Sequence, residues 1–150
     1  KKAEQIYMAG STFEIGKANT LREGRDATII ASGICVADAC RVADKLAKEG
    51  IHVRVLDMFT IKPIDKDAII KASKETGAIV TVENHNILNG LGSAVAEVLS
   101  EEAPCRMKRL GVPDRFGEVG TIPFLKEKYH MTEKDIEEAV KSLISKKDVA

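Results

Sequence analysis

The chain has 150 residues, of which 44% are hydrophobic and 31% charged, and its 23 basic side chains balance 23 acidic ones. This is the size of one domain that can bury its own core. The balanced charge argues against nucleic acid as a partner, and no apolar run approaches the ~20 residues that a membrane helix needs.

The three cysteines, Cys35, Cys40 and Cys105, are odd in number and lack the two-residue spacing of zinc or redox motifs. We expect three reduced thiols, mostly buried, in a cytoplasmic protein. The chain starts on charged residues without an initiator Met, so it is compatible with a fragment of a longer protein.

The predicted elements alternate between strands and helices after a polar, glycine-containing segment at 1–25, which we interpret as a linker and an edge strand. Apolar runs predict strands, and apolar residues at helical spacing predict helices. In chain order we expect a strand at 27–32, a helix at 36–48, a strand at 51–57, a helix at 65–75, a strand at 78–83, a loop at 86–92, a helix at 93–101, a strand at 105–110, a short helix at 123–129 and a terminal helix after 132.

Several polar residues mark the ends of these helices. Asp65 is a suitable N-cap for the second helix, and Gly77 closes it. Thr132 and Asp135 resemble a capping box with Asp in place of Glu. The alternation predicts right-handed crossovers, and therefore a mainly parallel sheet covered by helices on both faces in a single α/β domain over 26–150.

Ligands of such sheets bind beyond the carboxyl ends of the strands, where one loop combines several polar and small residues. Glu83 and His85 are followed by Gly90 and Gly92. A carboxylate beside an imidazole suits acid–base chemistry, and glycines allow a ligand to approach the backbone. The alternative is structural: Glu83 and His85 hydrogen-bond neighbouring loops, and the glycines allow close packing of helix on strand.

The remaining polar candidates carry weaker signals. Asp114 and Arg115 belong to a charged loop that is either a solvated face or a subunit contact. Asp57, at a strand end, is expected to cap a turn. His52 and His130 have no other ligand-type residue at metal-binding spacing, so no metal site is predicted.

At this point the order of the motifs matches a known family. The chain resembles the C-terminal domain of transketolase-type enzymes throughout most of its length, and the segment at 57–65 is the most specific part of the likeness. The matching segments, in order, are 13–18, 21–24, 27–33, 57–65, 82–85, 90–95 and 111–118.

The resemblance implies a three-layer α/β/α fold whose five-stranded sheet is mostly parallel with one antiparallel edge strand. It also implies a parent transferase, a dimer, that moves a two-carbon ketol unit between sugar phosphates with thiamine diphosphate and a divalent cation such as Mg. In that family other domains hold the cofactor. We therefore expect no catalytic, cofactor-binding or metal-binding residue here, and an isolated chain that is inactive.

On this view Glu83, His85, Gly90, Gly92, Asp114 and Arg115 form an interface or an accessory loop. The implied partners are the thiamine-binding domains, or the N-terminal subunit, of the same transketolase, within a homo-oligomer. Two alternatives remain open: the C-terminal domain of a 2-oxoacid dehydrogenase β-type subunit, which docks an acyltransferase, and that of a 1-deoxy-D-xylulose-5-phosphate synthase.

Overall fold

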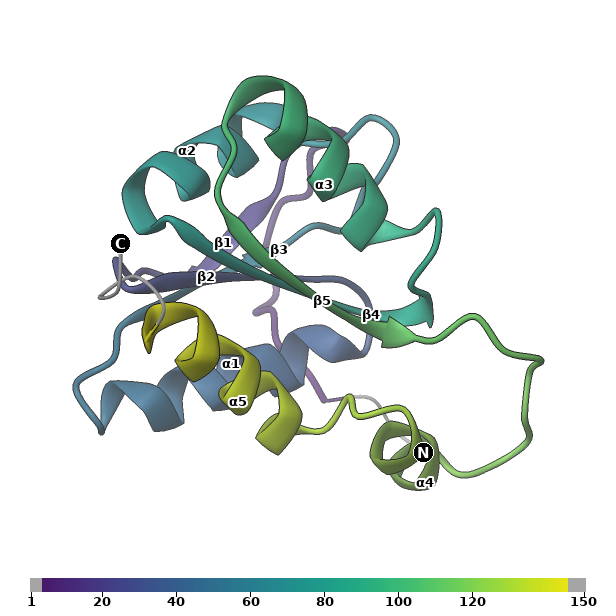
Figure 1. The fold of residues 1–150 in the computed structure, drawn as a ribbon. Coiled ribbons are helices and arrows are strands. Elements are labelled where there is room, and N and C mark those ends of the chain that lie inside the picture. The colour runs from purple at the N-terminus through teal and green to yellow at the C-terminus, as the bar shows by residue number, and fades with distance from the viewer. Residues whose placement is uncertain (1–3, 146–150) are drawn as a thin grey trace.

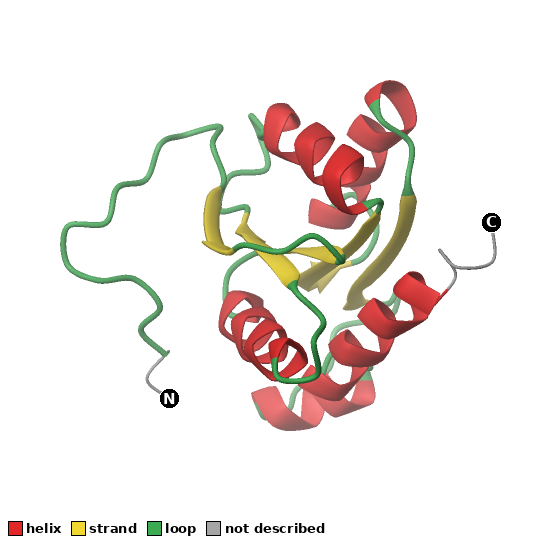
Figure 2. Ribbon diagram, turned by 90° about the vertical axis from the view of Figure 1, so that its left-hand side faces the viewer, coloured by secondary structure: helices red, strands yellow, loops and turns green. Residues whose placement is uncertain are grey.

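The computed structural model describes residues 4–145, which form one sheet between two layers of helices (Figures 1 and 2). The sheet has five strands in the order β1-β3-β2-β4-β5. The elements are β1 (Asn19–Arg22), β2 (Ala27–Ala31), α1 (Cys35–Ala47), β3 (Val53–Asp57), α2 (Lys66–Thr76), β4 (Ala78–Asn86), α3 (Leu91–Glu102), β5 (Arg106–Val112), α4 (Ile122–Lys128) and α5 (Glu133–Ser145).

The direction of the strands confirms the predicted fold class. Strands β3, β2, β4 and β5 pair in parallel, whereas β1 pairs antiparallel with β3 at the edge. Parallel strands need crossover connections, and the helices between them cover both faces of the sheet. No helix within residues 4–145 combines the length and apolar character that crossing a membrane requires.

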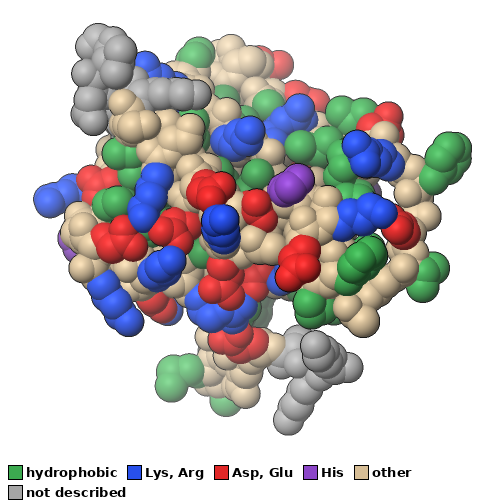
Figure 3. All heavy atoms as spheres, turned by 60° about the horizontal axis from the view of Figure 1, so that its bottom comes forward, with side chains coloured by type: hydrophobic (Ala, Val, Ile, Leu, Met, Phe, Trp, Pro, Cys, Tyr) green, Lys and Arg blue, Asp and Glu red, His purple; other side chains and the backbone are tan. Residues whose placement is uncertain are grey.

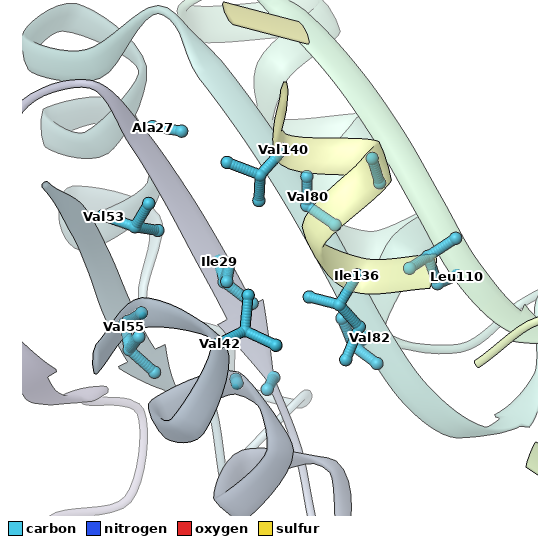
Figure 4. Packing of buried hydrophobic residues seen from close by; sticks show 14 of the residues in the cluster. Ala27, Ile29, Val42, Val53, Val55, Val80, Val82, Leu110, Ile136 and Val140 are labelled. Carbon is cyan, nitrogen blue, oxygen red and sulfur yellow. The ribbon is translucent and has the colours of Figure 1, made fainter. Parts of the chain in front are cut away.

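Side chains along the central strands point alternately to the two faces of the sheet, and this divides the hydrophobic core into two parts. On one face Ile29 and Val80 pack beneath α1 and α5, where Val42 and Ile136 point toward the sheet (Figure 4). On the other face Ile30 and neighbouring apolar residues pack beneath α2 and α3. Because successive side chains point to opposite faces, residues 79, 81 and 83 of β4 all lie on the α3 side.

The caps predicted for α2 and α5 are confirmed. The Asp65 side chain accepts a hydrogen bond from the Ala68 N–H at 3.0 Å, and Gly77 adopts a left-handed conformation with φ of 61°. The Asp135 carboxylate accepts from the Thr132 N–H at 2.8 Å, while the Thr132 hydroxyl accepts from the Asp135 N–H at 3.3 Å. This reciprocal pair is the capping box expected from the sequence.

Charged side chains join α1 to α5 across the outer surface of their layer. Arg41 donates to Glu133 at 2.8 Å and Lys45 to Glu137 at 2.6 Å. Lys141 contacts both Glu137 and Glu49, each at 2.7 Å. Figure 3 shows acidic and basic side chains interspersed over this face.

At the carboxyl ends of β2 and β4, the two neighbouring strands lead into helices on opposite faces of the sheet. The connection after β2 runs through α1 on one face, and the connection after β4 runs through α3 on the other (Figure 1). This is the position at which open α/β sheets form a crevice. The loop that contains Glu83, His85, Gly90 and Gly92 lies at this edge.

Candidate functional site at the β4–α3 loop

The Glu83 carboxylate caps helix α3. Its side chain is 1% exposed, and alternation along β4 directs it beneath that helix. One carboxylate oxygen accepts from the Leu91 N–H and the other from the Gly92 N–H, each at 2.7 Å. The first N–H groups of a helix lack partners within it, and the helix dipole favours a negative charge there. Both oxygens of Glu83 are therefore used inside the domain.

The two glycines make room for this cap. A Cβ atom on Gly90 would lie 2.0 Å from Glu83 Oε2, and one on Gly92 would lie 2.8 Å from Thr81 Oγ1. Any side chain at position 90 would displace the carboxylate. The glycines thus permit close packing of α3 on β4.

Hydrogen bonds fix the rest of the loop. The Asn86 side chain accepts from the Leu88 N–H at 2.8 Å and donates to Asp114 at 3.2 Å. Arg109 donates to the Ile87 carbonyl at 3.1 Å and to the Ser93 hydroxyl at 3.2 Å. The loop is therefore tied to β5 and to the segment that follows it.

The structure brings most of the sequence candidates together. Glu83, His85 and Gly90 are adjacent, and Asp114 reaches the loop through Asn86. The His85 ring is exposed, and its Nδ1 lies 2.9 Å from the Asn86 carbonyl. Arg115 is exposed on the segment after β5. An interface or accessory role for this set stays a prediction.

The predicted boundaries at this loop differ from the structure. Strand β4 continues through Asn86, which pairs with Val112 of a correspondingly longer β5 after an irregularity in register. Helix α3 begins at Leu91 because Glu83 satisfies its first N–H groups. The polar sequence 84–86 lacks the apolar pattern of a buried strand, so sequence periodicity ended the strand too early.

Asp57 at the end of β3 has a partner that sequence reasoning missed. The Tyr7 hydroxyl donates to the Asp57 carboxylate at 2.6 Å, and Tyr7 stacks edge-on against Phe13. Burial raises the pKa of Asp57, although the Tyr7 hydrogen bond opposes that shift. Burial and the bond to Asp57 also raise the pKa of Tyr7. Asp57, expected to cap a turn, instead anchors the N-terminal arm at 4–18, which bows outward on the β1 side of the sheet (Figure 2).

The thiols offer little nucleophilic character. Cys35 and Cys40 are buried within α1, and Cys105 is half-buried. Burial raises the pKa of Cys35 to about 11 and also raises that of Cys40. Since the thiolate is the reactive form, these two side chains act as small apolar residues.

Comparisons with known proteins show which family the sequence matches. A model of the family described as "Transketolase, C-terminal domain" matches residues 16–136. A 6-deoxy-6-sulfo-D-fructose transketolase subunit, SqwH, from Clostridium sp. (strain MSTE9) is 45% identical over 148 residues, covering 99% of this chain and 46% of that protein. An apulose-4-phosphate transketolase subunit from Phocaeicola vulgatus is 51% identical over 102 residues, covering 68% of this chain and 32% of that protein.

Solved structures agree. A chain of a split-gene transketolase, described as an inactive beta4 tetramer, superposes with a TM-score of 0.90 at 44% identity, covering 95% of this chain and 47% of that one. Transketolase from Campylobacter jejuni has a TM-score of 0.63 at 20% identity, covering 85% of this chain and 18% of that one, and supports the fold. This chain thus spans less than half the length of these relatives. With its fold and its family match in agreement, the chain belongs to the transketolase C-terminal domain family.

Proposed function

We propose that this chain is the C-terminal domain of a transketolase, the enzyme that transfers a two-carbon ketol unit between sugar phosphates. Its role is structural: it packs against the other domains and contributes to a homo-oligomer, and alone it is inactive. The support is the 44% identity to a split-gene transketolase chain, in a match that covers 95% of this chain. Residues 26–150 form the domain proper, residues 1–25 supply the linker and edge strand, and the assembly is cytoplasmic.

The observation that carries this role is the buried glutamate cap. A carboxylate that exchanges protons with a substrate must reach it. Glu83 instead uses both oxygens on the N-terminus of α3, beneath Gly90. The strongest acid–base candidate in the sequence therefore serves the architecture of the loop.

Thiamine diphosphate and Mg²⁺, which the family implies, do not fit the described residues. A divalent cation that holds a diphosphate needs several oxygen ligands in a fixed arrangement. Within residues 4–145 no three His, Cys, Asp or Glu side chains gather as ligands of one ion. Glu83 is buried, and both of its oxygens point to the N–H groups of α3. The cofactor belongs to partner domains of the parent enzyme.

Those partners are the thiamine-binding domains, carried either on the same polypeptide or on a separate N-terminal subunit. Two of the relatives are named as transketolase subunits, which favours a divided enzyme. A second candidate is 1-deoxy-D-xylulose-5-phosphate synthase. The enzyme of that name from Heliobacterium modesticaldum is 40% identical over 134 residues, covering 89% of this chain and 21% of that protein. Product analysis of the complete enzyme separates the two.

The test measures cofactor binding and activity in two states. Titration calorimetry of residues 1–150 with thiamine diphosphate and Mg²⁺ should give no heat of binding. Ketol transfer should appear only when the chain is joined to, or mixed with, the polypeptide that carries the thiamine-binding domains. Micromolar cofactor binding by the isolated chain would overturn this division of labour.

A further inference from the structure

Among the described residues, four of the ten exposed large hydrophobic side chains lie in helix α4 and the segment before it. No residue of α4 is buried, and Ile122 and Phe124 are each 47% exposed. Phe116 and Val119, which precede the helix, are fully exposed. We call these four residues the α4 face. In Figure 3 hydrophobic side chains gather at the right-hand end of the molecule, where α4 and this segment lie.

Two hollows separate α4 from the body of the domain. One, of about 520 Å³, is lined by Ile34 and Ala37 of the α1 side and by Ile122 and Pro123 of α4. The other, of about 360 Å³, lies between α4 and the ends of β4 and β5, and Asn84, Val112 and Ile122 contribute to its lining. A helix that is exposed outside and incompletely packed inside is typical of a surface that another protein covers.

Charges around the α4 face are largely neutralised within the domain. Lys126 pairs with Asp38, and Lys128 pairs with Glu118 at 2.5 Å. Arg41, near the same hollow, pairs with Glu4, Asp38 and Glu133. Paired cations offer little to a sugar phosphate, whereas an apolar centre with a charged rim suits a protein surface.

The course of the N-terminal arm indicates which polypeptide covers the α4 face. Glu4 and Ile6 line the same hollow as Ile122 and Pro123. The described part of the chain therefore begins beside α4, at Glu4. Two relatives are about twice as long as this chain, since it spans 46% of the Clostridium subunit and 47% of the split-gene chain.

We propose that the α4 face packs against the polypeptide that lies ahead of residue 1 in the complete protein. The proposal rests on the proposed function, because it names the surface that packs against a neighbouring domain. Phe116, Val119, Ile122 and Phe124 insert into that neighbour, and the two hollows receive its side chains. The opposite helical layer, α2 and α3, stays outside this contact.

Amide hydrogen exchange tests the proposal without reference to activity. The protein expressed from the complete coding sequence is compared with the 150-residue chain at two concentrations. Exchange of residues 116–128 should slow by about tenfold or more in the complete protein, independently of concentration. Protection that appears in the 150-residue chain only at high concentration assigns the face to a second copy and overturns the proposal, as does a reading frame with nothing ahead of residue 1.

Substitution supplies the control. In the complete protein Ile122→Asp combined with Phe124→Asp should abolish the added protection while exchange in α2 and α3 stays unchanged. Ile61→Asp, at a side chain that is 41% exposed on the β3–α2 connection, should leave it intact. Equal effects of the two variants would refute the assignment. A complete protein that shows the protection but lacks ketol transfer would refute the proposed function and leave this surface standing.

Discussion

Removing the Glu83 carboxylate should destabilise the domain by far more than removing any exposed carboxylate. Glu83→Ala leaves the N–H groups of Leu91 and Gly92 buried without acceptors, in a place that water reaches poorly. Glu83→Gln keeps the shape and one acceptor, but it turns an amide NH₂ toward one of the two N–H groups. Both variants also lose the negative charge at the N-terminus of α3.

The magnitude follows from these contacts. Each buried N–H left without a partner costs about 1–3 kcal/mol. The charge at a buried helix N-terminus contributes ~0.3–2 kcal/mol more. We expect Glu83→Ala to lower the free energy of unfolding by roughly 3–5 kcal/mol and Glu83→Gln by about 2–3 kcal/mol. Domains have only about 5–15 kcal/mol in total, so the alanine variant comes near to unfolding.

Urea unfolding followed by far-ultraviolet circular dichroism measures these changes. Glu97→Gln is the matched control because it removes the same charge from the exposed face of the same helix. It should alter stability by no more than ~0.5 kcal/mol. If Glu83→Gln changed stability as little as Glu97→Gln, the carboxylate would not be the cap that its hydrogen bonds indicate.

Three further predictions follow from the same loop and from the anchor of the N-terminal arm. Gly90→Ala should cost about 2 kcal/mol or more in urea unfolding, because its Cβ would lie 2.0 Å from Glu83 Oε2, whereas Gly117→Ala, with open space around it, should cost much less. Burial raises the pKa of Asp57, so the folded carboxyl keeps its proton to a higher pH than the unfolded one, whose pKa is about 3.9. The stability of the wild type relative to Asp57→Asn should therefore fall as pH rises above about 4, and unfolding curves at several pH values would contradict this if the difference grew instead. In the complete enzyme His85→Ala should lower turnover modestly and in step with oligomer stability, and a loss of ~100-fold with an intact oligomer would reveal an acid–base role.

Much of the fold could be predicted from local sequence patterns. The capping contacts of Asp65, Gly77 and the Thr132–Asp135 pair join residues that are three or four positions apart, so their sequence spacing was sufficient to predict them. The parallel sheet likewise follows from alternation of apolar runs with amphipathic segments. The edge strand was harder, because its short polar sequence has no periodicity; the polar segment at 1–25 indicated a linker and an edge strand, but only the family resemblance indicated that the strand is antiparallel.

Contacts between residues that are distant in the sequence could not be predicted from it. Tyr7 and Asp57 are 50 positions apart, and nothing near either residue marks the other as its partner. The exposure of α4 was equally hidden, since Ile122 and Phe124 look like core residues when only their hydrophobicity is considered. Sequence periodicity reports that a face is apolar, but it does not report whether this chain or another one covers it.

The Glu83 loop illustrates why residue types alone left two interpretations open. A glutamate, a histidine and two glycines at the end of a parallel strand are what an acid–base site requires, and they are equally what a buried helix cap requires. The register of β4 favours the cap, because it directs Glu83 under α3 and places Gly90 against the carboxylate. Glu83 is 1% exposed and each of its oxygens accepts an N–H at 2.7 Å, so a substrate would reach the carboxylate only if the first turn of α3 moved. That movement would break two charge-assisted hydrogen bonds, each stronger than an ordinary one, so the capped form of the loop is favoured.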